Sequence, residues 1–565
     1  MKYSLVKGLS STQIAIIVAV VVIIVVIGAV AGVLLTRKPT TTVVTTTVTS
    51  TITTSTTTPV VTTTSITQAK VNIVFYNWLG SVNQDAFNSF IPYFEKLYPN
   101  YMFQSYLVPG AGGVNAKYAI LALIEAGKPP TTFQTHYGPE MISYVEAAPN
   151  GSYNFVNMTP IAQNMGLFKY VVPSVLEAGA YNGTLFSLPI DAGEGGLLYV
   201  NIKLLREYNL PLPTNLSALT YDTIQLYNHG IHPWIIPGGD GGWDQLNLWE
   251  NIFLALGGPR LYNEMTYGTI NFNNITVQKI INQTNYLFLN YSSYNYPGWQ
   301  PMQWTQGIAL LIQGQTAFQT NGDWVTDYAY DFLNTTIYPA TEPYISWPNV
   351  SVVVEPFPST QNYFALVVDS VAVPKSPYQN AGITLAETWA SYQGQELWTK
   401  WKMIGYYTND TDFYVTPAQW YNYERLLNTS PQDFVYQLSD GGVFDDVFAE
   451  LDSGILTLAQ VGNAGLSAWN STLVSAMHEE ESEWLAAAKL GLGYLGFPNH
   501  PFANYYPPWV KDPAAYGLKS SKSVNSDTSS LSLILILLGS TILATEVLIN
   551  KKFISKEMIT KLIKR

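Results

Sequence analysis

Polar and aromatic side chains in this chain directly follow predicted strands, where α/β proteins commonly hold a ligand. Asn77 and Trp78 come straight after the short apolar run from Val71 to Tyr76. In open α/β sheets, ligands lie beyond the carboxyl ends of the strands. We therefore expect both side chains at a cleft, where the flat indole of Trp78 could hold the C–H face of a sugar. A tryptophan buried in a domain core is the alternative.

Gln134 and His136 stand two residues apart in a strand-like segment. Because successive side chains of a strand point to opposite faces, this spacing places the amide and the imidazole on the same face. Both could face the cleft and contact a ligand; the alternative is a structural role, which is the more common one for a lone histidine. His229 and His232 have no companion carboxylate or thiolate at metal spacing, so the histidines predict no metal site.

A glycine-rich segment, Gly238 to Gly242, surrounds Asp240 and leads to Trp243 and Asp244. It lacks the Gly-Lys-Ser/Thr of a phosphate-binding loop, so it does not indicate a nucleotide site. As a turn before a helix that begins near Asp244, it would present Trp243 as a second aromatic platform opposite Trp78. Asp240 and Asp244 belong to the same candidate site. A hairpin tip with an exposed tryptophan is the alternative.

Further carboxylates could accept hydrogen bonds from sugar hydroxyls. Asp323 and Trp324 adjoin each other, Asp369 follows an apolar run, and Asp191 lies where we expect the chain to cross between two lobes. A charge-assisted hydrogen bond is worth about 1.5–3 kcal/mol. Three or four of them with one stacked ring, against an association cost of several kcal/mol, predict an affinity near micromolar or better.

The composition excludes several classes of protein. A net charge of −12 and a pI near 4.9 argue against nucleic-acid binding. Because the chain has no cysteine, it can form neither a disulfide framework nor a thiolate metal site, and we expect no cofactor. Aromatic residues make up 14% of the chain and charged residues only 12%. Such a polar, weakly charged and aromatic surface favours contact with carbohydrate.

Twelve Asn-x-Ser/Thr sequons are spread along the chain. About half would arise by chance in a sequence this rich in Asn, Ser and Thr, but their spread predicts a glycosylated exterior. They begin at Asn150, Asn157, Asn182, Asn215, Asn274, Asn282, Asn290, Asn334, Asn349, Asn409, Asn428 and Asn470.

Both ends of the chain predict membrane anchors. The apolar run from Ile14 to Leu35 is long enough to cross a bilayer and longer than the apolar region of a secretory signal. Residues 36–69, rich in Thr and Ser, predict an extended stalk, because such a segment cannot bury a core. A second run, Leu531 to Ile549, predicts another transmembrane helix after a linker at 516–530. A helix that lies on the membrane surface is the alternative for this second run.

Charge predicts the topology of these anchors. The tail at residues 550–565 is basic, and Lys2 and Lys7 precede the first run. Clusters of basic residues beside a span mark the cytoplasmic side. The C-terminus is therefore predicted to be cytoplasmic, and the residues between the two spans are predicted to be extracellular.

Residues 70–515 form the payload between the anchors. Their number is too large for one core and predicts two lobes. Val71 to Tyr76 and Tyr101 to Val108 have strand-like patterns, whereas Gln84 to Leu97 and Asn115 to Glu125 have apolar residues at helical spacing. Short strands that alternate with helices predict an α/β fold with parallel βαβ units.

Seven stretches of the payload occur in the order of one known family. They are Val71 to Gly80, Ala126 to Tyr137, Tyr181 to Leu205, Pro237 to Trp249, Gln313 to Trp324, Val354 to Pro374 and Ser391 to Glu396. Together they resemble the extracellular solute-binding proteins (family 1) of ABC sugar importers, closest to the glucose-binding type of thermophilic archaea. The charged head that ends in Gly8 resembles an archaeal class III, pilin-type signal peptide. That resemblance implies a leader at residues 1–8, cleaved before Leu9; an uncleaved signal anchor is the alternative.

The resemblance implies a two-lobed, type II periplasmic-binding-protein-like fold with an interlobe cleft. It also implies a receptor that is not an enzyme and that hands a sugar to the permease subunits of an ABC transporter. We expect lobe one at about 70–190 and 357–406, and lobe two at about 191–356 and 407–515. Two departures leave the sugar open: Ala192-Gly193-Glu194-Gly195 replaces a His-Arg type pair, and Trp78-Leu79 replaces a double tryptophan.

Two other functions compete with this interpretation. Paired carboxylates among many aromatics also describe glycoside hydrolases, but the chain has no nucleophile elbow, no metal-ligand cluster and no eightfold barrel pattern. The pilin-like N-terminus suggests a structural surface subunit, or self-assembly through that helix. A pilin head, however, would be a small β-rich domain.

Overall fold

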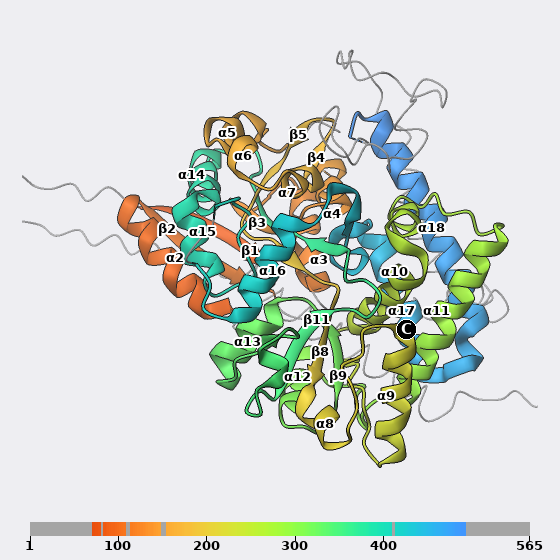
Figure 1. The fold of residues 1–565 in the computed structure, drawn as a ribbon. Coiled ribbons are helices and arrows are strands. Elements are labelled where there is room, and N and C mark those ends of the chain that lie inside the picture. The colour runs from red at the N-terminus through yellow and green to blue at the C-terminus, as the bar shows by residue number, and fades with distance from the viewer. Residues whose placement is uncertain (1–69, 81–82, 109–112, 148–153, 410–412, 493–565) are drawn as a thin grey trace, which may run out of the picture. The chain divides into compact units, whose positions relative to one another are not determined.

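The computed structural model describes most of the payload (Figure 1). The described residues are 70–80, 83–108, 113–147, 154–409 and 413–492. The predicted leader, stalk, both transmembrane helices, linker and basic tail lie outside them. Of the helices in the described part, none combines the length and the apolar character that a membrane crossing needs.

The first sheet contains the predicted parallel units. β1 (Val71–Asn77) lies between β2 (Tyr101–Leu107) and β3 (Thr132–His136) and pairs in parallel with both. β13 (Asp369–Ala372) and β6 (Ser187–Pro189) complete the order β2-β1-β3-β13-β6 in antiparallel register. The parallel βαβ units expected at the start of the payload are confirmed. β13 alone runs against the other four strands, and both it and β6 come from later parts of the chain.

The helices between these strands cover the first sheet. α2 (Gln84–Leu97) follows β1, and α3 (Val114–Glu125) follows β2, close to the predicted bounds. The phenylalanines of α2 recur every three or four residues and are buried, as an amphipathic helix requires. Phe90 stacks on Trp389 of α14 (Gln379–Ala390), with ring centroids 4.6 Å apart. A helix from the second half of the chain therefore packs on the N-terminal helix.

The second sheet has the order β10-β11-β8-β9 and is mainly antiparallel. β8 (Leu197–Asn201) runs antiparallel to both β9 (Phe318–Asn321) and β11 (Val352–Pro356). β10 (Tyr338–Pro339) pairs in parallel with β11 at the edge. The buried, β-branched sequence of β11 fits a strand covered on both faces.

A three-stranded sheet contains the strands next to the chain crossings. Its order is β14-β12-β7, with β7 at Gly193–Glu194, β12 at Phe364–Val367 and β14 at Phe434–Tyr436. β6 of the first sheet is followed by β7, and β12 is followed by β13 of the first sheet. The two crossings lie side by side, since Ile190 N–H donates to Asp369 O at 2.8 Å.

Long helices pack against each other, and α10 also packs against β9 of the second sheet (Figure 1). They are α9 (Leu216–Asn228), α10 (Trp243–Thr266), α11 (Ile275–Ser293), α17 (Asp445–Val461) and α18 (Leu466–Lys489). Trp249 and Trp469 are buried there and donate to the same acceptor, Asn285 Oδ1, at 2.8 and 2.9 Å. Sharing one amide oxygen satisfies both indole N–H groups, which would otherwise be costly to bury.

Shorter elements complete the described part. The helices are α4 (Pro139–Glu146), α5 (Thr159–Asn164), α6 (Leu167–Tyr170), α7 (Pro173–Ala178), α8 (Ile202–Glu207), α12 (Trp304–Ile312), α13 (Trp324–Leu333), α15 (Tyr392–Thr399) and α16 (Pro417–Asn428). The strands are β4 (Ala180–Tyr181) and β5 (Thr184–Leu185). Short 3₁₀ helices are η4 (Tyr344–Ser346), η5 (Pro431–Asp433) and η7 (Gly462–Gly465), and η6 (Leu438–Gly442) is a π-helical turn.

Candidate ligand-binding site

A cavity of about 480 Å³ brings together side chains from the first sheet and from the helices next to the second. We call it the Trp78 cavity. Seven of the residues singled out in the sequence line it: Trp78, Gln134, His136, Asp240, Trp243, Trp324 and Asp369. These residues are widely separated in the chain, and the fold brings them together around one cavity.

One side of the Trp78 cavity is the edge of the first sheet. Trp78 directly follows β1, and Gln134 and His136 lie at the carboxyl end of β3. Asp369 begins β13, whose antiparallel direction places its first residue opposite His136. All four side chains therefore meet at one edge, where the ends of parallel strands and the start of an antiparallel strand coincide.

Trp78 is fixed by contacts on both sides of its ring. Its backbone N–H donates to Gln134 Oε1 at 3.0 Å, and its ring meets His136 edge-on with centroids 5.1 Å apart. Gly113, before α3, has φ +97°, and a Cβ there would lie 2.9 Å from the indole Cγ. A glycine is required here both by the left-handed backbone and by the closeness of the ring.

The opposite side carries tryptophans at the starts of helices. Trp243, Trp304 and Trp324 are the first residues of α10, α12 and α13, and all three line the cavity. The rings of Trp243 and Trp324 lie 5.8 Å apart at 46°. Because the first backbone N–H groups of a helix lack intrahelical partners, the same positions also offer hydrogen-bond donors. The helix expected near Asp244 thus begins one residue earlier.

Asp369 is the most connected acidic group of the cavity. Its Oδ1 accepts from Gln134 Nε2 at 2.8 Å, and its Oδ2 accepts from Lys402 Nζ at 2.7 Å. His136 Nε2 lies 3.5 Å from Oδ1. Burial alone would raise the pKa of Asp369, but the charges of Lys402 and His136 outweigh it and lower the pKa below its usual value. The carboxylate is therefore ionised at neutral pH.

His136 is held on its other side by Glu140. His136 Nδ1 lies 2.9 Å from Glu140 Oε2, which also accepts from Lys117 Nζ at 2.8 Å. Burial would lower the pKa of His136, but the Glu140 carboxylate raises it overall. Despite burial, Lys117 and His136 lower the pKa of Glu140 to about 2. Lys117 also lies 3.6 Å from Asp445 of α17, so this chain of charges reaches the helices beyond the first sheet.

Asp440 and Asp240 add two carboxylates to the wall with the tryptophans. Trp243 Nε1 donates to Asp440 Oδ1 at 3.2 Å, and Trp304 N–H donates to Asp240 Oδ2 at 2.7 Å. Burial raises the pKa of Asp440 to about 6, although His136 and Lys117 partly oppose the effect. Asp440 thus orients the indole of Trp243, Asp240 holds the backbone at the start of α12, and each carboxylate keeps further lone pairs as acceptors.

Four of the predicted site residues do not line the Trp78 cavity. Asn77 is buried and donates to Ser105 Oγ at 2.8 Å. Asp191 is buried where the chain crosses and accepts from Trp398 Nε1 at 2.8 Å. Asp244 follows Trp243 in α10, and Asp323 precedes α13, both buried. Direct contact of these four with a ligand stays a prediction, and the structure gives Asn77 and Asp191 clear packing roles.

Several lining residues escaped the sequence analysis. Lys402, Asp440 and Gln303 lie in no recognisable motif, and they join the cavity only through the fold. A signal existed for Lys402: a lysine flanked by Trp401 and Met403 and followed by apolar Ile404 indicates burial and so a need for a counter-charge. Among the described residues, no group of three or more His, Cys, Asp or Glu stands close enough to hold a metal ion.

The sequence matches a known protein family and a relative that is named for glucose binding. Residues 80–382 match the family model described as bacterial extracellular solute-binding protein. The chain is 63% identical over 463 residues to the glucose-binding protein GlcS of Saccharolobus solfataricus, covering 82% of this chain and 83% of that protein.

Solved structures show the same fold at low sequence identity. A chitin oligosaccharide binding protein is 17% identical with a TM-score of 0.60, covering 73% of this chain and 98% of that one. A solute-binding protein of an ABC transporter from Thermotoga lettingae, bound with α-D-tagatose, is 15% identical with a TM-score of 0.54, covering 73% and 99%. These likenesses show the two-lobed α/β architecture of solute-binding proteins for this chain.

Proposed function

Because the chain belongs to the family of bacterial extracellular solute-binding proteins, we propose that it captures a sugar for an ABC transporter. The proposed ligand is glucose or a related monosaccharide, held in the Trp78 cavity. The observation that carries the proposal is the ionised carboxylate of Asp369, which Lys402 holds in place by a hydrogen bond. It lies in the same cavity as several tryptophans. The high identity to a protein named for glucose binding supports the choice of sugar.

The two sides of the cavity match the two kinds of surface on a sugar. A pyranose has apolar C–H faces, which aromatic rings cover, and a rim of hydroxyl groups, which carboxylates and amides bind. Trp78 and Trp243 supply rings from opposite sides. Asp369, Asp240 and Asp440 supply acceptors, while Gln134 can donate or accept. A volume of about 480 Å³ leaves room for a small sugar with water.

Capture is proposed to involve closure about the two crossings. The paired segments at Ile190 and Asp369 join the lobes, which we place at about 70–190 with 357–406, and at about 191–356 with 407–515. Hinges are a few residues at the ends of elements, and the crossings between β6 and β7 and between β12 and β13 are of that kind. The closed form is then the one that the permease recognises.

The membrane topology remains part of the proposal. The predicted spans at 14–35 and 531–549 would hold the payload outside the cell on the stalk at 36–69, with a cytoplasmic basic tail. Protease added to intact cells should cut within the stalk, and the payload should then stay attached through the span at 531–549. Protection of the payload until the cells are lysed would place it inside and contradict the receptor function.

A ligand screen by thermal shift tests the sugar itself. The full-length protein in detergent is heated with glucose, galactose, mannose, xylose and short oligosaccharides, each at several concentrations. A ligand at one hundred times its Kd stabilises the folded state by about 2.7 kcal/mol, so a bound sugar raises the Tm with concentration. Chromatography of the same mixtures checks for cleavage. No shift with any sugar, or hydrolysis of an oligosaccharide, would overturn the proposal.

A further inference from the structure

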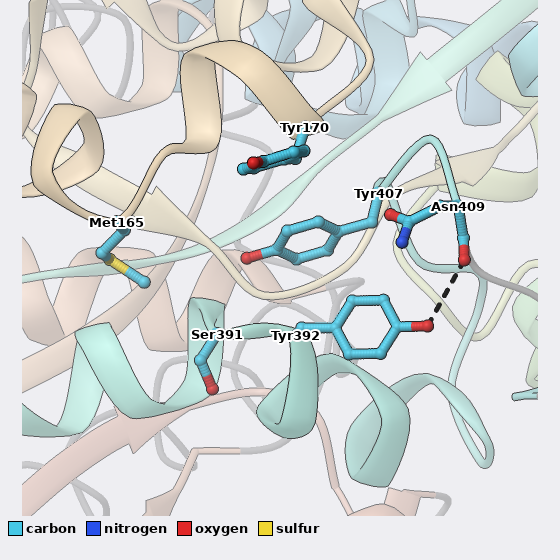
Figure 2. A pocket seen from close by; sticks show the side chains of 6 residues that line it. All are labelled: Met165, Tyr170, Ser391, Tyr392, Tyr407 and Asn409. Atoms are coloured by element: carbon cyan, nitrogen blue, oxygen red, sulfur yellow. Dashed lines mark hydrogen bonds between the residues drawn. The ribbon is translucent and has the colours of Figure 1, made fainter.

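A second pocket of about 390 Å³ lies apart from the Trp78 cavity and shares no lining residue with it. Figure 2 shows three tyrosines gathered around it. We call it the Tyr170 pocket. It is lined by Met165, Tyr170, Ser391, Tyr392, Tyr407 and Asn409. Its residues come from the segment around α6, the start of α15 and the chain after Tyr406.

Two tyrosines of the Tyr170 pocket are partly exposed, with the Lys169 ammonium 4.7 Å from the ring centroid of Tyr170. Tyr170 is 44% exposed and Tyr392 is 37% exposed. Tyr407 is buried beneath them and meets Tyr392 edge-on, with centroids 5.4 Å apart. The pocket therefore has a rigid aromatic floor with polar phenol edges, a surface suited to the C–H faces and hydroxyls of a sugar.

Asn409 at the rim begins a sequon, Asn409-Asp410-Thr411, and its side chain is exposed. Two hydrogen bonds fix its position. Thr408 N–H donates to Tyr170 O at 2.8 Å, and the Tyr392 hydroxyl donates to Asn409 O at 3.3 Å. In Figure 2 the side-chain amide of Asn409 points back towards the tyrosines. The atom that would carry a glycan thus lies beside the aromatic floor.

We propose that the Tyr170 pocket binds the first sugars of an N-linked glycan attached to Asn409. The covalent bond keeps the sugar at a high effective concentration beside the rings, so even weak stacking suffices to hold it there. The glycan would cover the exposed faces of Tyr170 and Tyr392 and leave the Trp78 cavity free. This proposal does not depend on sugar capture in that cavity.

Tyrosine labelling of the full-length protein, purified from the cells that naturally make it, tests the proposal. Mass spectrometry of glycopeptides first determines whether Asn409 carries a glycan. The native chain is then compared with the variant Thr411→Ala, which removes the sequon and leaves Asn409 in place. Nitration by tetranitromethane should be several-fold faster at Tyr170 and Tyr392 in the variant. The exposed Tyr221 should react equally in both chains.

Matched variants separate a local effect from a general one. Asn282→Gln removes an exposed sequon elsewhere and should leave the nitration of Tyr170 and Tyr392 unchanged. Asn409→Gln should reproduce the effect of Thr411→Ala, and an unchanged circular dichroism spectrum shows that each variant folds. An unmodified Asn409 in the native chain, or equal nitration of the two tyrosines with and without the sequon, would overturn the proposal.

Discussion

The ammonium of Lys402 donates to Asp369 Oδ2 at 2.7 Å, while Gln134 occupies the other oxygen at 2.8 Å. The carboxylate is thus ionised and oriented before any ligand arrives. A carboxylate has about four lone-pair positions, so beside Gln134, Lys402 and the nearby His136 at least one remains for a sugar hydroxyl. Because the partners come from β3, from β13 and from the chain after α15, the site depends on the whole first lobe being folded.

Loss of Lys402 should weaken both stability and sugar binding. Lys402 is 5% exposed, and removing one partner of a buried ion pair typically costs about 3–5 kcal/mol. We expect Lys402→Met to lower the urea midpoint clearly and to reduce sugar affinity, as Asp369 then gains a proton or draws in water. Lys400→Met, two residues away and exposed, is the control and should behave like the native protein.

The carboxylates Asp369 and Asp323 should differ in their effect on affinity. Asp369→Asn removes the charge that accepts sugar hydroxyls, and a tenfold or greater loss of affinity is expected, since tenfold is about 1.4 kcal/mol. Asp323 does not line the cavity, and burial raises its pKa well above the usual value. The neutral amide of Asp323→Asn therefore should change affinity less than Asp369→Asn. Calorimetric titration of both variants decides, and equal losses would contradict this difference.

Trp78 and Trp243 should each contribute stacking to the bound sugar. Truncating either ring to alanine is expected to cost on the order of 1–3 kcal/mol of binding free energy. Fluorescence titration measures the affinity, and the melting curve shows whether the variant folds. Trp347, which is 41% exposed and away from the cavity, provides the control substitution. Unchanged affinity in both variants would remove the two rings from the site.

The sequence predicted local features of the fold but not the pairing of strands that are distant in the chain. The bounds of α2 and the face shared by Gln134 and His136 followed from periodicity and spacing, because both are local properties. The first lobe's parallel strands followed in the same way. Topology beyond that point was not predictable in detail, since the antiparallel pairing of β8 with β9 joins residues more than a hundred positions apart.

The cavity residues that the sequence analysis did not predict were missed for the same reason, namely their dependence on long-range contacts. Lys402 and Asp440 enter the Trp78 cavity through long-range packing, and no local pattern marks either one as a ligand contact. Conversely, Asn77 was expected to follow the strand as a site residue would, but it is the last residue of β1 and its amide donates to Ser105 of the neighbouring strand. Position after a strand predicts the edge at which a side chain lies, but it does not predict the side chain's partner.

Lowering the pH should reduce the free energy of unfolding, because Glu140 then becomes protonated. Lys117 and His136 lower its pKa from 4.5 to about 2. A carboxylate with a lowered pKa stabilises the folded state fully above pH 4.5, and this contribution is lost as the pH falls towards 2. A shift of this size corresponds to a stabilisation on the order of 3 kcal/mol. Glu140→Gln should therefore lower the Tm at pH 7.

The difference in Tm between the native protein and Glu140→Gln should shrink as the pH is lowered from 4.5 to 2. Glu264→Gln, at a partly exposed pair with Arg260, is the control and should show almost no difference at any pH. A difference that stays constant down to pH 2 would show that Glu140 acts through packing and not through its charge.

Calorimetric titration of the full-length protein with glucose tests the central claim most directly. The account predicts saturable binding at one site per chain, in the micromolar range or tighter, with at least tenfold weaker binding to Asp369→Asn. Absence of binding to any monosaccharide, or equal affinity in the native protein and Asp369→Asn, would contradict the assignment of the Trp78 cavity as the sugar site.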